Sequence, residues 1–299
     1  MKRVVKIVLI VLLCLVVIAA LAIGYATLQS ERKLNRKIDV NAAAVPFVST
    51  PEALAQGKYL FDSRGCGECH GSRGEGRVMI DAPNGFYVRT TNITSGGATA
   101  RYSERDWVLA IRHGVKPDGK PIFLMPSEDY NRLTDVDLAA VVGYTRSLPP
   151  APASQAEVRL PLPMKVVYGL GLMRDAAGKI DHTLPPPRPV AVAVSVAHGE
   201  YVAKTCIGCH GEGLSGGKVP GGPPEWPPAA NLTSGSGSVM PIYDSTEKFR
   251  AMMRTGKRPN GSEVNQAMPF GALKSMTDVD LDAMYAYLKT VPARATGGR

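Results

Sequence analysis

The sequence predicts a mainly α-helical protein in which an N-terminal membrane-spanning helix is followed by two tandem copies of one helical module. Three observations support this prediction. Residues 7–28 form an apolar run without a charge, a Cys-X-X-Cys-His motif occurs twice, and matched segments recur around both motifs. The helices indicated between them are short, and the 31 Gly and 24 Pro of the chain concentrate in the connecting loops.

The apolar run at the N-terminus is 22 residues long. As a helix it would measure about 33 Å, enough to cross the hydrocarbon core of a bilayer. The alternative is a cleaved secretory signal, with a basic start at residues 2–3 and a cleavage triplet at residues 20–22. Its length favours a retained anchor, and we assign residues 1–49 to this anchor and its tether. Cys14 lies inside the run and is interpreted as a buried membrane cysteine.

Residues 66–70 read Cys-Gly-Glu-Cys-His, and residues 206–210 read Cys-Ile-Gly-Cys-His. This spacing is typical of c-type haem attachment. Each thiol can add to one vinyl group of the porphyrin edge, and the histidine that follows then lies beneath the iron. We therefore expect two covalently bound haem c groups, attached through Cys66, Cys69, Cys206 and Cys209, with His70 and His210 as iron ligands.

Three other uses of such motifs are a disulfide, a redox dithiol and a zinc site. A disulfide or a redox dithiol does not need the histidine that follows each pair. A zinc site would need a fourth ligand near each motif, and the other histidines stand alone. Haem attachment explains all three positions of the motif at once.

A repeat extends well beyond the two motifs. Segments 55–59, 92–96, 112–119, 125–126 and 134–137 match segments 197–201, 231–235, 254–261, 268–269 and 277–280. The offsets run from 139 to 143 residues, so the two halves are one module used twice. We expect the modules to occupy residues 50–150 and 195–299.

Within the first module, three helices have recognisable signals. Residues 50–52, Thr-Pro-Glu, combine a capping residue with proline in the first turn. In the helix that follows, Gly57 is expected to allow a close helix crossing, although a merely tolerated glycine is the alternative. A short helix is expected over residues 107–113, and a last helix from the cap at Thr134 to about residue 148.

Residues 151–194 form a linker that is rich in proline at both ends. Its apolar middle, residues 164–173, is too short to cross a membrane. We expect it to be a strap packed across the two modules, with a docking strip for a partner protein as the alternative.

The sixth position of each iron decides between electron transfer and small-molecule chemistry. A thioether there closes the site and raises the reduction potential. Met125 and Met268 are matched in the repeat, 55 and 58 residues after the respective histidines. Met240 also precedes a proline but has no counterpart, and Met79 is too close to the first motif. We expect Met125 and Met268 to be axial ligands, with core packing as the alternative for any one methionine.

The remaining polar candidates are the acceptors that orient the motif histidines, the other three histidines, and the repeated Asn and Thr residues. The second ring nitrogen of each ligand histidine is expected to bond a backbone carbonyl, in Pro83 for one and in Pro223 or Pro224 for the other. Ordinary surface or turn positions are expected for His113, His182 and His198. The polar residues of the repeat that would bond haem propionates, or simply form turns, are Asn92, Thr94, Asn231 and Thr233.

With these motifs, the chain resembles the class I cytochrome c fold used twice. Segments 107–126 and 268–288 are also similar to the multihaem cytochrome c subunits of membrane-bound alcohol and gluconate dehydrogenases. That family usually has three attachment motifs, and this chain has two. The resemblance implies a mostly helical fold around each haem and electron passage to quinone, an oxidase or another cytochrome.

The formal net charge of +9 is mostly local. Residues 1–37 carry seven Lys or Arg and one Glu, a net +6, so the remaining chain holds only +3. Propionates of two haems would bring that part near neutrality. We therefore expect a membrane but no nucleic acid among the partners.

The resulting prediction is a dihaem cytochrome on the periplasmic side of the inner membrane, because covalent haem attachment of this type belongs outside the cytoplasm. It would transfer electrons between a membrane dehydrogenase or quinol-oxidising complex and a terminal oxidase or other cytochrome, without catalysis of its own. One alternative is a dihaem enzyme such as a peroxidase, with one reactive haem. Another is a structural subunit whose second haem is not on the electron path.

Overall fold

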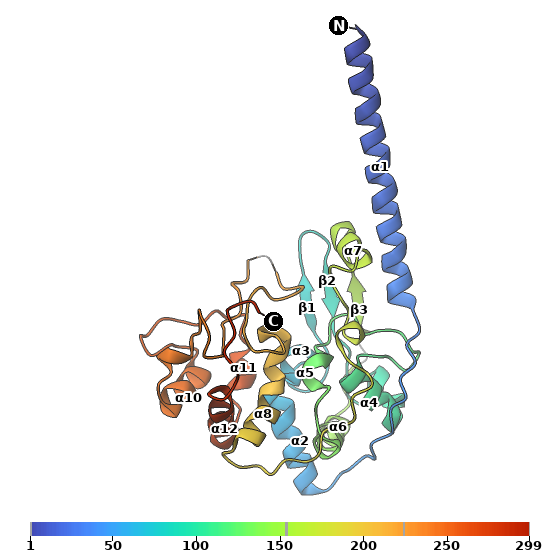
Figure 1. The fold of residues 1–299 in the computed structure, drawn as a ribbon. Helices are drawn as coiled ribbons and strands as arrows, with labels where there is room; N and C mark the ends of the chain where they lie inside the picture. The colour runs from blue at the N-terminus through green and yellow to red at the C-terminus, as the bar shows by residue number, and fades with distance from the viewer. Residues whose placement is uncertain (1, 153–154, 224, 299) are drawn as a thin grey trace.

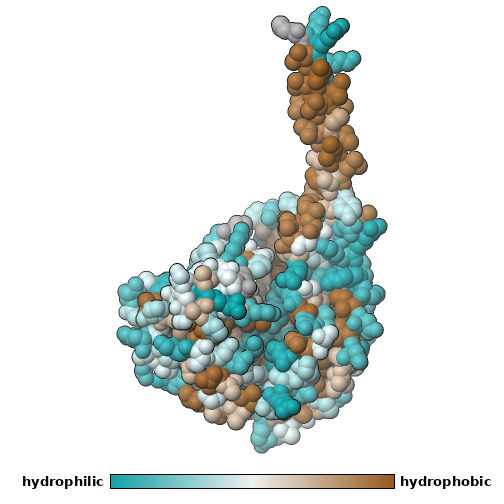
Figure 2. Space-filling view, viewed as in Figure 1, coloured by the Kyte–Doolittle hydropathy of each residue, from teal (hydrophilic) through white to brown (hydrophobic). Residues whose placement is uncertain are grey.

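The computed structural model describes residues 2–152, 155–223 and 225–298. Residues 153–154 of the predicted linker lie outside this description. Helix α1 (Lys2–Asn35) projects from a body that contains all the other elements (Figure 1). Among the described residues it is the one helix long and apolar enough to cross a membrane. Figure 2 shows its apolar surface as a continuous column outside the body. The predicted anchor thus has the expected helical form.

The first module contains one long helix pair and three shorter helices. Their bounds are α2 (Pro51–Ser63), α3 (Cys66–His70), α4 (Glu104–His113), α5 (Ser127–Tyr130) and α6 (Asp135–Ser147). The predicted caps are confirmed, because the hydroxyls of Thr50 and Thr134 accept the backbone N–H groups three residues later. Helix α4 begins three residues before the predicted start, since Ser103 and Asp106 form a capping box.

The second module repeats this order. Its helices are α8 (Val196–Ala203), α9 (Ile207–His210), α10 (Thr246–Thr255), α11 (Phe270–Leu273) and α12 (Asp278–Leu288). Single 3₁₀ turns occur at Ala98–Arg101, Ala177–Lys179, Lys204–Cys206 and Met240–Ile242. The mainly helical fold class predicted from the sequence is confirmed.

In both modules the first and last long helices cross at a glycine. A Cβ atom added to Gly57 would lie 2.0 Å from the carbonyl oxygen of Ala140 in α6. The equivalent atom on Gly199 would lie 1.9 Å from the carbonyl oxygen of Ala283 in α12. No side chain fits at either crossing, so Gly57 has the predicted use and is not merely tolerated.

A small antiparallel sheet flanks the first module, in the order β1-β2-β3. Its strands are β1 (Val78–Asp81), β2 (Tyr87–Arg89) and β3 (Glu157–Arg159). Strand β3 comes from the linker and pairs Arg159 with Tyr87. The sequence did not indicate these strands, because each is only three or four residues long, β1 and β3 are mostly exposed, and none has an alternating pattern.

The linker also contains α7 (Leu162–Gly169), which packs against α1 beside the base of the projecting helix (Figure 1). The ammonium group of Lys33 donates to the carbonyl oxygens of Tyr168 and Gly169, both at 3.0 Å. Arg36 forms a two-bond ion pair with the buried Asp175. The described hydrogen bonds therefore tie the linker to α1 and the first module. Met173 of the linker also lies beside Gly221 of the second module, so packing of the linker across both modules stays a prediction.

Candidate functional site

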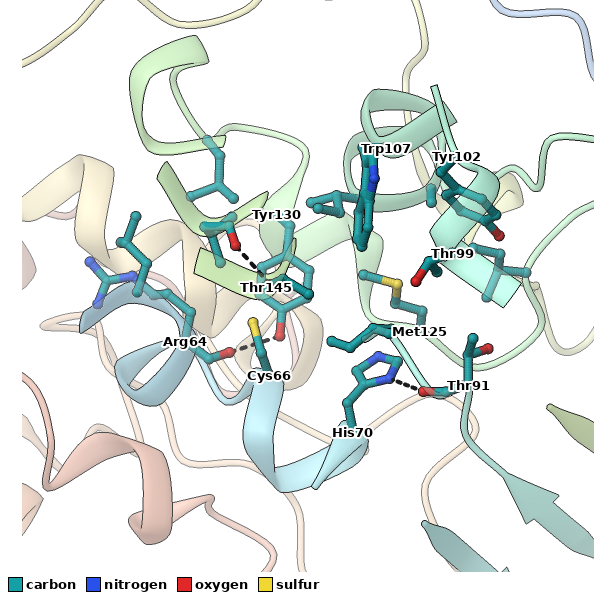
Figure 3. Close-up of a pocket in the computed structure, with 17 residues that line it drawn as sticks. Arg64, Cys66, His70, Thr91, Thr99, Tyr102, Trp107, Met125, Tyr130 and Thr145 are labelled. Carbon is teal, nitrogen blue, oxygen red and sulfur yellow. Dashed lines mark hydrogen bonds between the residues drawn. The ribbon is translucent and has the colours of Figure 1, made fainter. Parts of the chain in front are cut away.

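A largely apolar cavity of about 90 Å³ lies at the centre of the first module. Cys66, His70 and Met125 all line it, and Figure 3 shows the Met125 sulfur and the His70 ring facing the same space. His70 and Met125, which are 55 positions apart in the sequence, thus line one cavity.

The attachment motif is positioned by its own short helix. Helix α3 begins after Gly65, which has a φ of +77°, and ends at Gly71, which has a φ of +82°. Residues three apart in a helix lie on one face, so both thiols of the motif point the same way. Burial raises the pKa of the Cys66 thiol to about 12 and likewise that of Cys206 to about 12. Both therefore stay protonated until they react.

The histidines of the two motifs make equivalent hydrogen bonds. The Nδ1 atom of His70 donates to the carbonyl oxygen of Thr91, and that of His210 to the carbonyl oxygen of Ala230, both at 2.8 Å. A donating Nδ1 fixes the tautomer in which Nε2 carries the ring's lone pair, the one that metal binding would use. Burial lowers the pKa of His70, although the bond to Thr91 opposes this, so the ring is neutral at physiological pH.

The predicted acceptors of these bonds were wrong. The carbonyl groups of Pro83 and Pro223 are not used, and Pro224 lies outside the described residues. The actual acceptors, 21 and 20 residues after their histidines, immediately precede the repeated Asn-X-Thr segments. The repeat could therefore have identified these acceptors, since each one directly precedes the Asn-X-Thr segment of its module.

The loops that carry the two candidate methionines have the same conformation. The N–H group of Ser127 donates to the carbonyl oxygen of Met125 at 2.9 Å, and that of Phe270 to the carbonyl oxygen of Met268 at 2.9 Å. Met268 packs against the core that Cys206 also contacts. Met240 is instead a buried member of that core, in a 3₁₀ turn.

The Asn-X-Thr segments form turns, and Asn92 and Thr94 are not among the residues that line the cavity. Asn92 accepts from the backbone N–H and the hydroxyl of Thr94 at 2.9 and 2.7 Å, and its amide donates to the carbonyl oxygen of Ala151. Asn231 and Thr233 repeat this arrangement. All four residues are fully buried, so the turn interpretation is supported over propionate binding.

Two further donors, which the sequence pattern does not single out, belong to residues that line the cavity. The indole Nε1 of Trp107 and the hydroxyl of Thr99 are buried, line the cavity and have no hydrogen-bond partner among the described residues. Buried polar groups in native proteins are nearly always bonded. A ligand with an apolar body and an accepting carboxylate would satisfy both groups. A haem with its propionates has this chemistry, so the cavity fits the group.

Two of the three remaining histidines, His113 and His198, are buried, contrary to expectation, whereas His182 lies half-buried in a turn. His198 is buried and its Nε2 atom lies 2.7 Å from a carboxylate oxygen of Asp280. The Nδ1 atoms of His113 and His182 lie 3.1 Å apart. Burial, assisted by His182 and Arg112, lowers the pKa of His113 to about 4. These partners are between 69 and 82 residues away, so sequence spacing gave no sign of them.

Among the described residues, no group of three or more His, Cys, Asp or Glu side chains is arranged to hold a metal ion. The zinc alternative therefore finds no complete ligand set in this part of the chain.

The family model for cytochrome c matches residues 54–149 and 196–292, well over half of the chain. The chain therefore belongs to the cytochrome c family, whose members hold haem c covalently, and the resemblance found in the sequence is confirmed.

Three relatives illustrate where in this family the similarity lies. The fructose dehydrogenase cytochrome subunit of Gluconobacter japonicus is 27% identical over 87% of this chain and 58% of its own length. The cytochrome c subunit of the quinone-dependent alcohol dehydrogenase of Gluconacetobacter polyoxogenes is 28% identical over 59% of this chain and 42% of its own length. The gluconate 2-dehydrogenase cytochrome c subunit of Pantoea cypripedii is 27% identical over 52% of this chain and 37% of its own length. The chain thus spans about half the length of these relatives.

Proposed function

We propose that this chain is a membrane-anchored dihaem cytochrome c that carries electrons as a subunit of a membrane-bound dehydrogenase. The observation that carries the proposal is the first-module cavity, which brings the thiol of Cys66, the imidazole of His70 and the thioether of Met125 to one space. The names of the three relatives given above, which are cytochrome subunits of sugar, alcohol or sugar-acid dehydrogenases, support the assignment to such a complex.

Each module has a matching set of residues for one haem, and we propose two haems per chain. The residues that would hold them are Cys66, Cys69, His70 and Met125 in residues 50–150, and Cys206, Cys209, His210 and Met268 in residues 195–299. When bound, a haem with histidine and methionine ligands supplies a reversible one-electron couple of raised potential.

The protein's own contribution is to bind, orient and exclude water. The carbonyl groups of Thr91 and Ala230 fix the ring orientation of the two histidines. The apolar wall of the cavity includes Leu60, Ile93 and Val141 and keeps solvent from the metal position. A dry site of this kind favours electron transfer over reaction with small molecules.

We further propose that α1 anchors the chain in the cytoplasmic membrane with both modules on the periplasmic side. The exposed apolar surface of α1 supports the anchor (Figure 2). The periplasmic placement rests on the chemistry of covalent haem attachment. Confinement to the membrane raises the effective concentration of redox partners in the same bilayer. The partners proposed are a dehydrogenase or quinol-oxidising complex as donor and an oxidase or another cytochrome as acceptor.

A direct test starts from the full-length protein purified in detergent. Its mass should exceed the mass of the polypeptide by two haems, and both ferric sites should show the absorption of iron–thioether coordination. Met125→Ala should abolish that signature in one site and lower its potential, whereas the exposed Met79→Ala should leave both sites unchanged.

The same preparation separates the relay from a peroxidase. The unmodified protein should bind cyanide slowly and consume little peroxide, because both irons have a methionine ligand. Rapid cyanide binding or rapid peroxide turnover by the unmodified protein would contradict the relay and favour the dihaem enzyme.

A further inference from the structure

Helix α7 presents an apolar surface that no described residue covers. Leu162, Val167, Leu170 and Leu172, in α7 and directly after it, are all exposed, and Leu172 retains 74% of its accessible surface. Four large aliphatic side chains within eleven residues are unusual on a surface that faces water only, and such a patch marks an interaction site.

The position of α7 relative to α1 shows what would cover it. Gly169 packs on the backbone of Ala26, so closely that an added Cβ would lie 1.9 Å from the carbonyl oxygen of Ala26. Ala26 is within the apolar run of α1, two residues before its last apolar side chain. If α1 spans the bilayer, this crossing lies where the helix leaves the hydrocarbon, and α7 lies at the same depth.

The polar contacts of α7 agree with this depth. Lys165 pairs with Glu31 at 2.7 Å, and Lys33 donates to the last carbonyl groups of α7. These charges lie one turn beyond the apolar run of α1, at the level expected for lipid headgroups. An apolar face on one side and charged groups on the other are typical of a helix that lies in the membrane interface.

We infer that α7 is embedded in the interface of the bilayer crossed by α1, with the aliphatic side chains named above in contact with lipid. The occupant of this surface is thus the lipid itself. This inference rests on the proposed role of α1 as a membrane anchor.

The placement has a consequence for the first cavity. The ring of Tyr168 in α7 packs edge-on against Phe123, with ring centres 5.3 Å apart, and Phe123 precedes Met125 by two residues. The N–H group of Ala176, after α7, donates to the carbonyl oxygen of Ile122, which lines the cavity. A membrane-bound α7 therefore holds the Met125 loop, and with it the first module, next to the bilayer.

The test uses nitroxide labels on the full-length haem-loaded protein in phosphatidylcholine–phosphatidylglycerol nanodiscs. Collision of each label with molecular oxygen, which concentrates in lipid, is compared with collision with a water-soluble nickel complex. The labelled positions are native Cys14 in α1, Leu170→Cys in a Cys14→Ser background, and Val136→Cys in the same background. Val136 is an equally exposed apolar residue in α6, at the far end of the body from α1 (Figure 1).

We expect the oxygen-to-nickel collision ratio to be several-fold higher at positions 14 and 170 than at position 136. A ratio at position 170 equal to that at 136 overturns the inference, since α7 then faces water. A label at 170 shielded from both reagents also overturns it, because a second copy of the protein then covers the helix. A low ratio at position 14 shows instead that the anchor itself was wrongly assigned.

Discussion

The hydroxyl of Tyr59 in α2 donates to a carboxylate oxygen of Asp280 in α12 at 2.5 Å, and so joins the two modules. Tyr201 in α8 makes the same contact with Asp137 in α6, also at 2.5 Å. Tyr59 and Tyr201 are equivalent in the repeat, and so are the two aspartates. The modules thus meet through a reciprocal interface, of the kind that two-fold symmetric dimers form.

Each aspartate is also held from within its own module. The amide of Gln56 donates to Asp137 at 3.1 Å, and the equivalent residue His198 lies 2.7 Å from Asp280. The interface departs from symmetry at Arg64. Its guanidinium crosses from the first module to Asp280 at 2.9 Å, with both side chains about 4% exposed. The counterpart of Arg64 in the second module is Lys204, which is paired with Glu200 in its own module.

The asymmetry predicts unequal effects of two matched substitutions. Asp280→Asn leaves the Arg64 guanidinium buried without a counter-charge, and breaking such a pair typically costs about 3–5 kcal/mol. Asp137→Asn removes the equivalent carboxylate, which has no arginine partner, and should cost about 1–2 kcal/mol. Chemical denaturation of the haem-loaded protein measures both values. Equal losses for the two variants would show that Arg64 does not depend on Asp280.

The glycine crossings give a second prediction. Gly57→Ala places a methyl group against the carbonyl oxygen of Ala140, so α2 and α6 must separate. Overpacking of this kind costs about 1–3 kcal/mol, and thermal unfolding should show the loss. Gly24→Ala in α1 is the control, because an added Cβ there meets no atom within 4 Å. A Gly57→Ala variant as stable as this control would mean that the crossing of α2 and α6 can accommodate a methyl group.

The crossing at Gly57 and the caps at Thr50 and Thr134 could be predicted from sequence because their causes are local. Capping residues act within one turn, and the repeat marked the glycine-containing segment twice. The partner of α7 and the burial of His198 could not be predicted in this way. They depend on packing between segments far apart in the chain, where Asp280 is 82 residues from His198.

The repeat nevertheless contained more information than the motif alone. It aligned Met268 with Met125, and the two loops share their conformation, with ψ of 59° and 68° at the prolines that follow. It also aligned Gln56 with His198, a mismatch that coincides with the asymmetric part of the interface. Differences between otherwise matched positions were therefore informative about where the two modules diverge.

The assignment of Met268 over Met240 is testable by a pair of variants. Met268→Ala should remove the thioether absorption of the second site and lower its potential, because the iron loses its sulfur ligand. Met240→Ala should leave the spectrum unchanged but cost about 2–5 kcal/mol, since its side chain is 5% exposed in the core. Optical spectra, redox titration and denaturation distinguish these outcomes. A spectrum altered by Met240→Ala alone would reverse the assignment.

The paired rings of His113 and His182 predict how stability depends on pH. Burial is the main reason that the pKa of His113 is lowered to about 4, against an ordinary value of 6.5. The unfolded chain therefore binds a proton between pH 6.5 and pH 4 that the folded protein does not. The contribution of the neutral His113 ring to the free energy of unfolding is therefore complete above pH 6.5 and is lost as the pH falls from 6.5 to 4. Because solvent partly screens the ring, we expect the free energy of unfolding to fall by about 1–2 kcal/mol over this range.

The matched experiment is denaturation of the unmodified protein and of His113→Gln at pH 7 and at pH 4.5. Glutamine keeps a polar group beside His182 but does not titrate, so this variant should lose less stability between the two pH values. Carboxylates that titrate in the same range contribute equally to both proteins and cancel in the comparison. An identical loss in the two proteins would mean that His113 is protonated as readily in the folded chain as in the unfolded one, and that the pair is open to water.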